Sequence, residues 1–167
     1  MPSTDVVVIG LGGIGSAVLA ELARRGVDAI GIDRFDPPHT HGSTHGRTRI
    51  IRTAYFEHPD YVPLLHASSD GWETLEAETG RDLYREVGLL EVGPADGIVV
   101  PGVLAAADAH DLAIDRFTAE DLRAEFPDFT FTDGQVGVFE RRAGFLRVED
   151  CVRAALDVAR RGGATIR

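Results

Sequence analysis

Continuous apolar runs alternate with stretches of helical period along this chain, and the pattern predicts an α/β fold. The first apolar run, residues 4–9, shows no polar alternation, which is typical of a parallel strand buried on both faces. An alanine-rich amphipathic stretch follows and ends at Gly26, with its apolar stripe at Ile14, Ala17, Val18 and Leu22. A second apolar run, residues 27–32, then predicts a strand parallel to the first, because a right-handed crossover joins the two.

The rest of the chain continues the alternation of helices and strands. A long helix is predicted to begin at Asp60 and end at Gly80, with Pro63 near its first turn and an apolar stripe of Leu64, Leu65, Trp72 and Leu75. Thr118 and Asp121 have the spacing of a capping box ahead of a short helix. Two further helices are predicted over residues 99–109 and 148–159, and strands over 87–92, 114–117, 135–140 and 164–167.

The turn between the first strand and the first helix carries the glycines of a dinucleotide-binding motif. Gly10 allows a tight turn, Gly12 lets backbone N–H groups approach a pyrophosphate, and Gly15 lets helix and strand pack closely. The helix N-terminus adds a partial positive charge. Asp33 ends the second strand, where a carboxylate can accept hydrogen bonds from ribose hydroxyls. The glycine turn by itself suits NAD as well as FAD.

Composition narrows the classes of protein that remain. The chain has 167 residues and a net charge of −10, and all 17 of its basic residues other than histidine are arginine, which excludes lysine chemistry from these residues. Residues 1–56 hold 6 Arg and 5 Asp or Glu, so the glycine-turn end alone is not strongly acidic, as an anionic ligand requires. The sequence has no basic face that would indicate binding of nucleic acid. It has no apolar run long enough to span a membrane, and a cleaved signal peptide is not expected. The single cysteine, Cys151, fits a core residue in a cytoplasmic protein.

The segment after Asp33 is long, polar and rich in side chains that bind anions. Asp36-Pro37-Pro38 breaks regular structure, and three histidines and three arginines follow: His39, His41, His45, Arg47, Arg49 and Arg52. A helical turn starting near Ser43 or Thr44 would place Arg49 and Arg52 on one face. We prefer an anion and cofactor site here. A solvated loop and a metal site formed by the histidines are the alternatives, although no acid or cysteine partner lies near the histidines.

These motifs together resemble those of the monomeric sarcosine oxidases and N-methyl amino-acid oxidases, FAD-dependent enzymes related to D-amino-acid oxidase. The resemblance rests on the glycine turn, on Asp33, and on the runs Phe35-Asp-Pro-Pro-His39 and Gly42-Ser-x-His45-Gly-x-Thr-Arg49-Ile-Ile-Arg52. Later segments agree with it: Tyr61-Val-Pro63, Gly88-Leu-Leu, Phe126-Pro127 and Gly144-Phe-Leu. It extends over all 167 residues but over only about the first half of such an enzyme.

The resemblance implies a role for each candidate residue. The pyrophosphate of FAD would lie on the glycine turn, and Asp33 would hold the adenosine ribose. His45 and Arg49 would lie near the flavin ring, where a cation stabilises the charge of the reduced flavin, and Arg52 would bind a substrate carboxylate as a paired fork. The cofactor-binding residues implied in full are Gly10, Gly12, Gly13, Ile14, Gly15, Asp33, Arg34, His39, Ser43, Thr44 and Arg49; the catalytic ones are His45, Arg49 and Arg52; no metal is expected.

The fold implied is a Rossmann-type FAD-binding domain with the start of a mixed-sheet substrate domain. We expect residues 1–85 to form the first FAD segment, 86–144 part of the substrate domain, and 145–167 a returning FAD segment. The activity implied is oxidation of the C–N bond of a secondary amine or N-methyl amino acid, with O₂ giving H₂O₂. Two alternatives stay open: an FAD-dependent dehydrogenase of the same fold, and a non-catalytic FAD-binding fragment that needs a partner chain.

The chain also departs from the family pattern. Such enzymes usually carry a cysteine bonded to the flavin and a lysine that assists reaction with oxygen, both in the second half of the protein. The last predicted strand stops after four residues. We therefore expect the remaining half as a continuing or separate chain. Thr44 and Arg47 stand where relatives often carry other residues.

Overall fold

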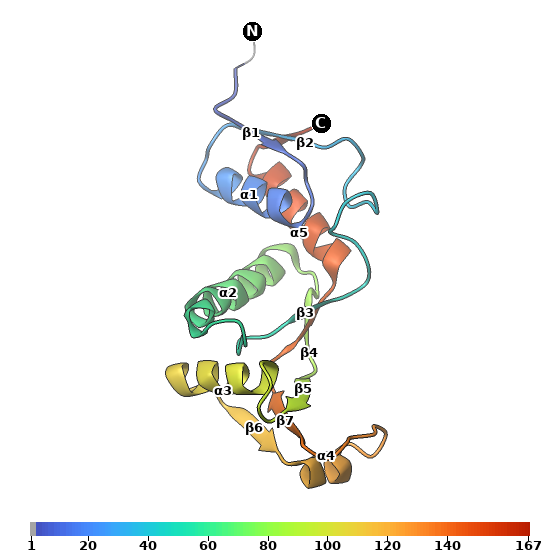
Figure 1. Cartoon of the computed structure of the whole chain (residues 1–167). Coiled ribbons are helices and arrows are strands. Elements are labelled where there is room, and N and C mark those ends of the chain that lie inside the picture. The colour runs from blue at the N-terminus through green and yellow to red at the C-terminus, as the bar shows by residue number, and fades with distance from the viewer. Residues whose placement is uncertain (1–2) are drawn as a thin grey trace. The chain divides into compact units, whose positions relative to one another are not determined.

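A parallel βαβ unit opens the chain, as the glycine turn between two apolar runs predicts (Figure 1). The computed structural model describes residues 3–167. β1 (Val6–Ile9) and β2 (Ala29–Ile32) pair in parallel along their whole length, and α1 (Gly13–Arg24) connects them. β9 (Thr165–Ile166) pairs in parallel with the other side of β2, so the sheet order is β1-β2-β9. The strand predicted at residues 164–167 therefore joins the sheet that carries the glycine turn.

The buried face of α1 differs from the face that the sequence pattern predicts. Ile14 is 84% exposed and Val18 is 44% exposed, so the stripe expected from these residues is wrong. The residues buried instead are Ser16, Leu19, Ala20 and Ala23. This face packs against α5 (Val148–Arg161), and its small side chains let the two helices approach closely. The stripe predicted on α5 is confirmed, because its members are all buried: Val148, Val152, Ala155, Leu156 and Ala159.

Cys151 is a core residue of α5, as expected from its position in the helical stripe. Its side chain is buried, and this burial raises the pKa of the thiol to about 12. A thiol with such a pKa stays protonated at neutral pH and is a poor nucleophile. Cys151 therefore contributes to packing in this part of the chain.

The long helix α2 (Val62–Thr79) follows a short 3₁₀ turn, η1 (Pro59–Tyr61), so the regular α-helix begins two residues after the predicted start. Gly80 ends it with φ +66°. Leu75 is buried as predicted, whereas Leu64 is 66% exposed and does not belong to the core face. The helix was therefore predicted correctly and its buried face only in part.

An antiparallel sheet in the order β5-β7-β6 forms the centre of the middle region of the chain. Its strands are β5 (Leu89–Pro94), β6 (Ile114–Phe117) and β7 (Gln135–Glu140). Two helices accompany it, α3 (Val99–His110) and α4 (Ala119–Glu125). The capping box is confirmed: the Thr118 side chain accepts from the Asp121 N–H while Asp121 accepts from the Thr118 N–H. The core includes Ala54, Val100, Val103 and Val138.

Three short strands were not predicted: β3 (Arg49–Ile51), β4 (Tyr84–Glu86) and β8 (Gly144–Leu146), which form a sheet in the order β3-β8-β4. Three residues are too few to establish a period of two, so the sequence pattern does not mark them. β3 contradicts the helical turn expected after Ser43. In an extended segment, side chains three residues apart do not share a face, so that reason for placing Arg49 beside Arg52 is wrong.

The chain divides into two compact units. The first unit combines residues up to Arg49 with Gly71–Tyr84 and Leu146–Arg167, and the second combines Ile50–Asp70 with Arg85–Phe145. Residues 50–70, which the sequence analysis groups with the glycine turn, thus belong to the second unit. Each change of unit falls inside a regular element, namely β3, α2, β4 and β8.

Across residues 3–167, the helices are too short or too polar to cross a membrane.

Candidate functional site

The glycine turn of the first unit has a backbone that only glycine accommodates at two of its positions. Gly10 adopts φ +88°, and its N–H donates to the carbonyl of Ile32 at 2.8 Å, which ties the turn to the end of β2. A Cβ placed on Gly15 would overlap the carbonyl oxygen of Gly10. The first turn of α1 therefore lies directly against the end of β1, as the glycine spacing predicts.

No acidic side chain of α1 caps the N-terminus of this helix. Gly12 caps the helix without a side-chain hydrogen bond, and the first turn holds no acidic residue. The N–H of Gly13 donates to the Thr44 hydroxyl oxygen at 3.1 Å, so the polar segment after Asp33 returns to the glycine turn. A positive helix end that its own first turn does not neutralise favours an anionic group such as a phosphate.

Asp33 links the glycine turn to the polar segment. Its Oδ2 accepts from the Leu11 N–H at 2.7 Å, and its Oδ1 lies 3.0 Å from Nε2 of His39 and accepts from the Phe35 N–H at 3.1 Å. Burial alone would raise the pKa of this carboxyl, but the hydrogen bonds from Leu11, Phe35 and His39 outweigh it and hold the pKa below its ordinary value. Asp33 is therefore ionised at neutral pH and held in one orientation.

The other candidates of the first unit are surface residues around this centre. Ile14 lies in the first turn of α1 and is 84% exposed, and Arg34 stacks over the Phe35 ring with its guanidinium carbon 5.5 Å from the centroid. Ser43, His45 and Arg49 are exposed. Among the described residues, Arg49 has no carboxylate within ion-pair distance. The structure thus brings Asp33, His39 and Thr44 to the glycine turn and leaves Ser43, His45 and Arg49 accessible.

Two histidines of this segment, His39 and His41, have ring contacts with Phe35. His41 stacks on Phe35 with ring centroids 3.9 Å apart, and His39 pairs with Asp33. Within residues 3–167, no group of three or more His, Cys, Asp or Glu side chains has the arrangement of a metal site.

Arg52 belongs to the second unit, where aromatic and acidic side chains surround its guanidinium. The guanidinium carbon lies 4.2 Å from the centroid of the Tyr55 ring. Its Nε is 3.6 Å from Oε1 of Glu91, and its Nη2 is 3.7 Å from Oε2 of Glu57. The side chain is only 16% exposed, and the buried Nε has no hydrogen-bond acceptor among the described residues. We call Arg52, Tyr55, Glu57 and Glu91 the Arg52 cluster.

Glu140 holds the backbone that follows Arg52. Its carboxylate accepts from the Thr53 N–H at 2.8 Å and 3.1 Å and from the Ala54 N–H at 3.0 Å, and the residue is 7% exposed. This anchoring connects the Arg52 segment to β7 of the same unit. Sequence reasoning missed both Glu140 and Glu91. One feature of the sequence indicates them: each is a single acid within, or at the end of, a strand that is otherwise mostly apolar.

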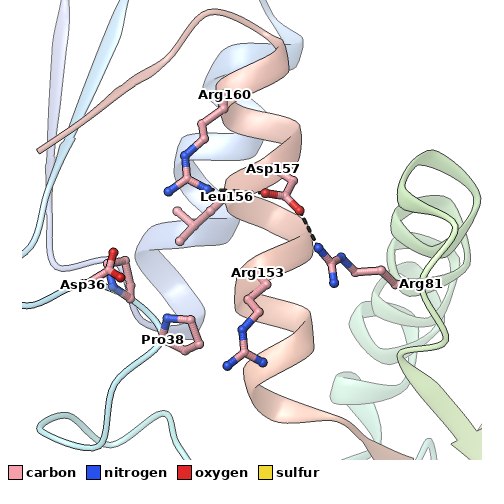
Figure 2. Close-up of a pocket in the computed structure, with 8 residues that line it drawn as sticks. Asp36, Pro38, Arg81, Arg153, Leu156, Asp157 and Arg160 are labelled. Carbon is pink, nitrogen blue, oxygen red and sulfur yellow. Dashed lines mark hydrogen bonds and ion pairs between the residues drawn. The ribbon is translucent and has the colours of Figure 1, made fainter.

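A separate pocket of about 380 Å³ lies in the first unit, beside α5 (Figure 2). Three arginines line it, and carboxylates neutralise each of them. Asp157 pairs with Arg81 at 2.7 Å and with Arg160 at 3.4 Å, as the dashed lines in Figure 2 show, while Arg153 pairs with Glu149 and Asp150. A network of ion pairs on the surface of α5 therefore lines this pocket. None of the lining residues belongs to the candidate site.

The parallel βαβ unit, the glycine turn and the ionised acid that closes β2 define a dinucleotide-binding protein. A model of the FAD dependent oxidoreductase (DAO) family matches residues 5–167. The chain belongs to this family, and its cofactor is accordingly FAD. The Rossmann-type fold expected from the sequence is confirmed.

Individual relatives belong to the group of oxidases that the sequence motifs resemble. The chain is 41% identical over 165 residues to a monomeric sarcosine oxidase of Streptomyces avermitilis, covering 99% of this chain and 43% of that protein. It is 35% identical over 162 residues to an N-methyl-L-tryptophan oxidase of Yersinia pestis, covering 97% of this chain and 44% of the relative. The resemblance drawn from the sequence is thereby confirmed, and the chain spans less than half the length of these relatives.

Solved structures show the same fold. NikD, described as an unusual amino acid oxidase essential for nikkomycin biosynthesis, superposes with a TM-score of 0.87 at 27% identity, over 100% of this chain and 43% of NikD. An L-proline dehydrogenase from P. horikoshii superposes with a TM-score of 0.80 at 20% identity, over 99% of this chain and 44% of that protein, and shows the fold alone.

The residues of the first unit fit the dinucleotide part of FAD. Gly15 lets the first turn of α1 lie directly against the end of β1, and that turn holds no acidic residue. The helix end therefore keeps its positive character where the glycine turn would bring it to a pyrophosphate.

Proposed function

We propose that this chain provides the FAD-binding residues and part of the substrate site of an oxidase that acts on the C–N bond of a secondary amine or N-methyl amino acid. FAD, when bound, supplies the chemistry of hydride acceptance from the carbon beside the amine nitrogen, with O₂ as the final acceptor and H₂O₂ as product. Every curated relative named above is an oxidase of this type, which supports the choice of O₂ over another electron carrier.

Within this proposal, the glycine turn binds the pyrophosphate and Asp33 binds the adenosine ribose. The hydrogen bonds from Phe35 and His39 occupy Oδ1 of Asp33 and the one from Leu11 occupies one side of Oδ2, which leaves about one lone pair, on Oδ2, for a ribose hydroxyl. Thr44 fixes the returning segment to α1. The remaining residues assigned to FAD binding are Gly10, Gly12, Gly13, Ile14, Gly15, Arg34, His39, Ser43 and Arg49.

Arg49 and His45 act on the flavin ring in this proposal. Their side chains are exposed, and Arg49 has no carboxylate counter-ion in the described part of the chain. A free guanidinium stabilises negative charge that develops on a neighbouring group, because its own charge is not already neutralised. His45 would donate or accept a hydrogen bond at the same place.

Arg52 binds the substrate carboxylate. Its buried Nε has no acceptor among residues 3–167, and Tyr55 covers one face of the guanidinium at 4.2 Å. An arginine that lies over a ring and whose two ion pairs, at 3.6 Å and 3.7 Å, are longer than hydrogen bonds is suited to paired recognition of a carboxylate. Recognition of this group would orient the amine end of the substrate.

The second unit would then be part of a substrate domain, and the first unit an FAD domain built from separated segments. The rest of the enzyme would come from a continuing or a separate chain. In support, β1 is an edge strand of the described sheet, and apolar side chains on β1 and α1 are exposed: Val7, Ile9, Ile14 and Val18. We also propose a cytoplasmic location, since one buried cysteine fits a reducing compartment.

One observation carries this proposal: hydrogen bonds connect Asp33 and Thr44 to the glycine turn, in a chain of the FAD dependent oxidoreductase family. The test uses the protein expressed from its complete reading frame. We expect a flavin absorption band, bleaching of this band by sarcosine without oxygen, and formation of peroxide in air. A bound flavin that no N-methyl or D-amino acid bleaches would disprove the oxidase function and leave the FAD-binding function standing.

A further inference from the structure

Arg52 faces two carboxylates of its own unit. Glu91 on β5 and Glu57 in the segment after β3 lie 3.6 Å and 3.7 Å from its nitrogens. Both separations are too long for hydrogen bonds, and Nε stays without an acceptor among the described residues. The positive charge of Arg52 is therefore compensated, while at least one of its buried donors remains unused.

The two acids differ in their exposure to solvent. The Glu57 side chain is 44% exposed, so water screens its charge, whereas the Glu91 side chain is 15% exposed. Burial raises the pKa of Glu91, and the negative charges of Glu140 and Glu57 act in the same direction. Of the charged groups that act on Glu91, Arg52 alone favours its ionised form. The charge of Glu91 thus depends on keeping Arg52 as its partner.

A ligand carboxylate bound to Arg52 would share the guanidinium with the carboxylate of Glu91. Two carboxylates within reach of one guanidinium leave a net negative charge, and their mutual repulsion in a buried place is not screened by water. Resting on the proposed role of Arg52, we propose that Glu91 is a specificity-determining residue that competes with the substrate carboxylate for Arg52. The competition weakens binding of carboxylated amines and leaves binding of amines without a carboxylate unaffected.

The test compares Glu91→Gln with the parent protein, using the complete, flavin-loaded enzyme. The probe is acetate, an unreactive carboxylate, titrated by its perturbation of the flavin spectrum. We expect the Kd of acetate to fall about tenfold at neutral pH, because the substitution removes one buried like charge and keeps the shape of the side chain. The KM of sarcosine should fall in parallel, with kcat nearly unchanged. The KM of dimethylamine, which has no carboxylate, should stay the same.

Glu57→Gln is the matched comparison, because it removes the same charge at nearly the same distance from a side chain open to solvent. We expect it to change the Kd of acetate by less than about threefold. Glu91→Ala serves as a second variant if Glu91→Gln lowers the melting temperature, and it should tighten acetate binding as well. An unchanged or increased Kd in a folded Glu91 variant overturns the inference.

The variant Arg52→Met distinguishes a failure of this inference from a failure of the proposed function. If Arg52→Met weakens acetate binding and Glu91→Gln does not tighten it, Arg52 binds carboxylates and the competition is absent. If Arg52→Met leaves acetate binding unchanged, the carboxylate lies elsewhere, and both the role of Arg52 and the inference are wrong.

Discussion

The hydroxyl oxygen of Thr44 accepts a hydrogen bond from the backbone N–H of Gly13, 31 residues earlier in the chain, at 3.1 Å. This bond fixes the polar segment after Asp33 to the first turn of α1. The segment that makes the family resemblance specific and the glycine turn are therefore parts of one site.

Thr44→Val should weaken FAD binding, because valine keeps the shape of threonine but has no acceptor for the Gly13 N–H. One such bond contributes about 0.5–1.5 kcal/mol, or about two- to tenfold in Kd. Titration of the apoprotein with FAD, followed by flavin fluorescence, measures the change. Thr44→Ser keeps the hydroxyl and should bind FAD nearly as the parent does. Equal Kd values for all three proteins would show that Thr44 does not order the site.

Asp33→Asn should reduce FAD affinity more strongly than Thr44→Val does. The amide has one acceptor oxygen in place of two and presents N–H groups to donors of Leu11 or His39. Hydrogen bonds to a charged group contribute about 1.5–3 kcal/mol, so we expect a loss of about ten- to a hundredfold. Asp36→Asn, a change at an exposed acid three residues later, is the control and should leave the FAD Kd unchanged. A loss of similar size in Asp36→Asn would assign the effect to general charge.

Acid should destabilise the first unit through Asp33. Its hydrogen bonds hold the folded-state pKa below the ordinary value of 3.8, so the stabilisation is complete above that pH and is lost as pH falls through the folded-state pKa. Melting temperature measured against pH should therefore drop more steeply below about pH 4 in the parent than in Asp33→Asn, which has no such proton to take up. Parallel curves for the two proteins would contradict this assignment.

Gly15→Ala should abolish FAD binding or folding of the first unit, because a Cβ at this position overlaps the carbonyl oxygen of Gly10. Gly71→Ala is the matched control. Gly71 lies within α2, and a Cβ there has no atom within 4 Å. Alanine is favoured over glycine in a helix by about 1 kcal/mol, so this control should raise the melting temperature by a few degrees. A Gly15→Ala protein that retains flavin would show that α1 can shift away from β1.

Arg52→Ala should raise the KM of carboxylated substrates by about ten- to a hundredfold, the cost of losing a hydrogen bond between charged groups. Flavin content, measured from the ratio of visible to ultraviolet absorbance, should stay near that of the parent, because Arg52 and the glycine turn belong to different units. Equal losses of flavin and of substrate affinity would place Arg52 on the cofactor instead.

The sequence identified the elements with long or strongly periodic patterns. β6 and β7 were predicted at their observed bounds. The stripe of α5 was correct, because its apolar residues recur at helical spacing along the whole helix. The buried face of α1 was wrong for a physical reason. Ile14 and Val18 repeat at helical spacing as well as Leu19 and Ala23 do. The packing partner α5, which begins 124 residues after α1 ends, decided which face was buried.

The same limit applies to the candidate site: residues that meet only through the fold could not be predicted from the sequence. Glycine spacing and an acid at the end of a strand can be recognised within a short stretch of sequence. Gly10, Gly15 and Asp33 could therefore be predicted. The acids around Arg52 were not, since Glu91 and Glu140 are 39 and 88 residues further along the chain and meet the Arg52 segment only through the fold. An isolated glutamate in an apolar strand indicates a buried partner but does not identify it.

The boundaries between the units have a consequence for the evolution and engineering of such enzymes. The chain changes unit inside β3, α2, β4 and β8, so the second unit is two separate insertions into the first rather than an appended module. A recombination event that exchanges the second unit must replace residues 50–70 and 85–145 together and keep the hydrogen bonds of the strands at their ends. Shuffling of whole domains therefore needs two coordinated replacements, whereas a point substitution needs none.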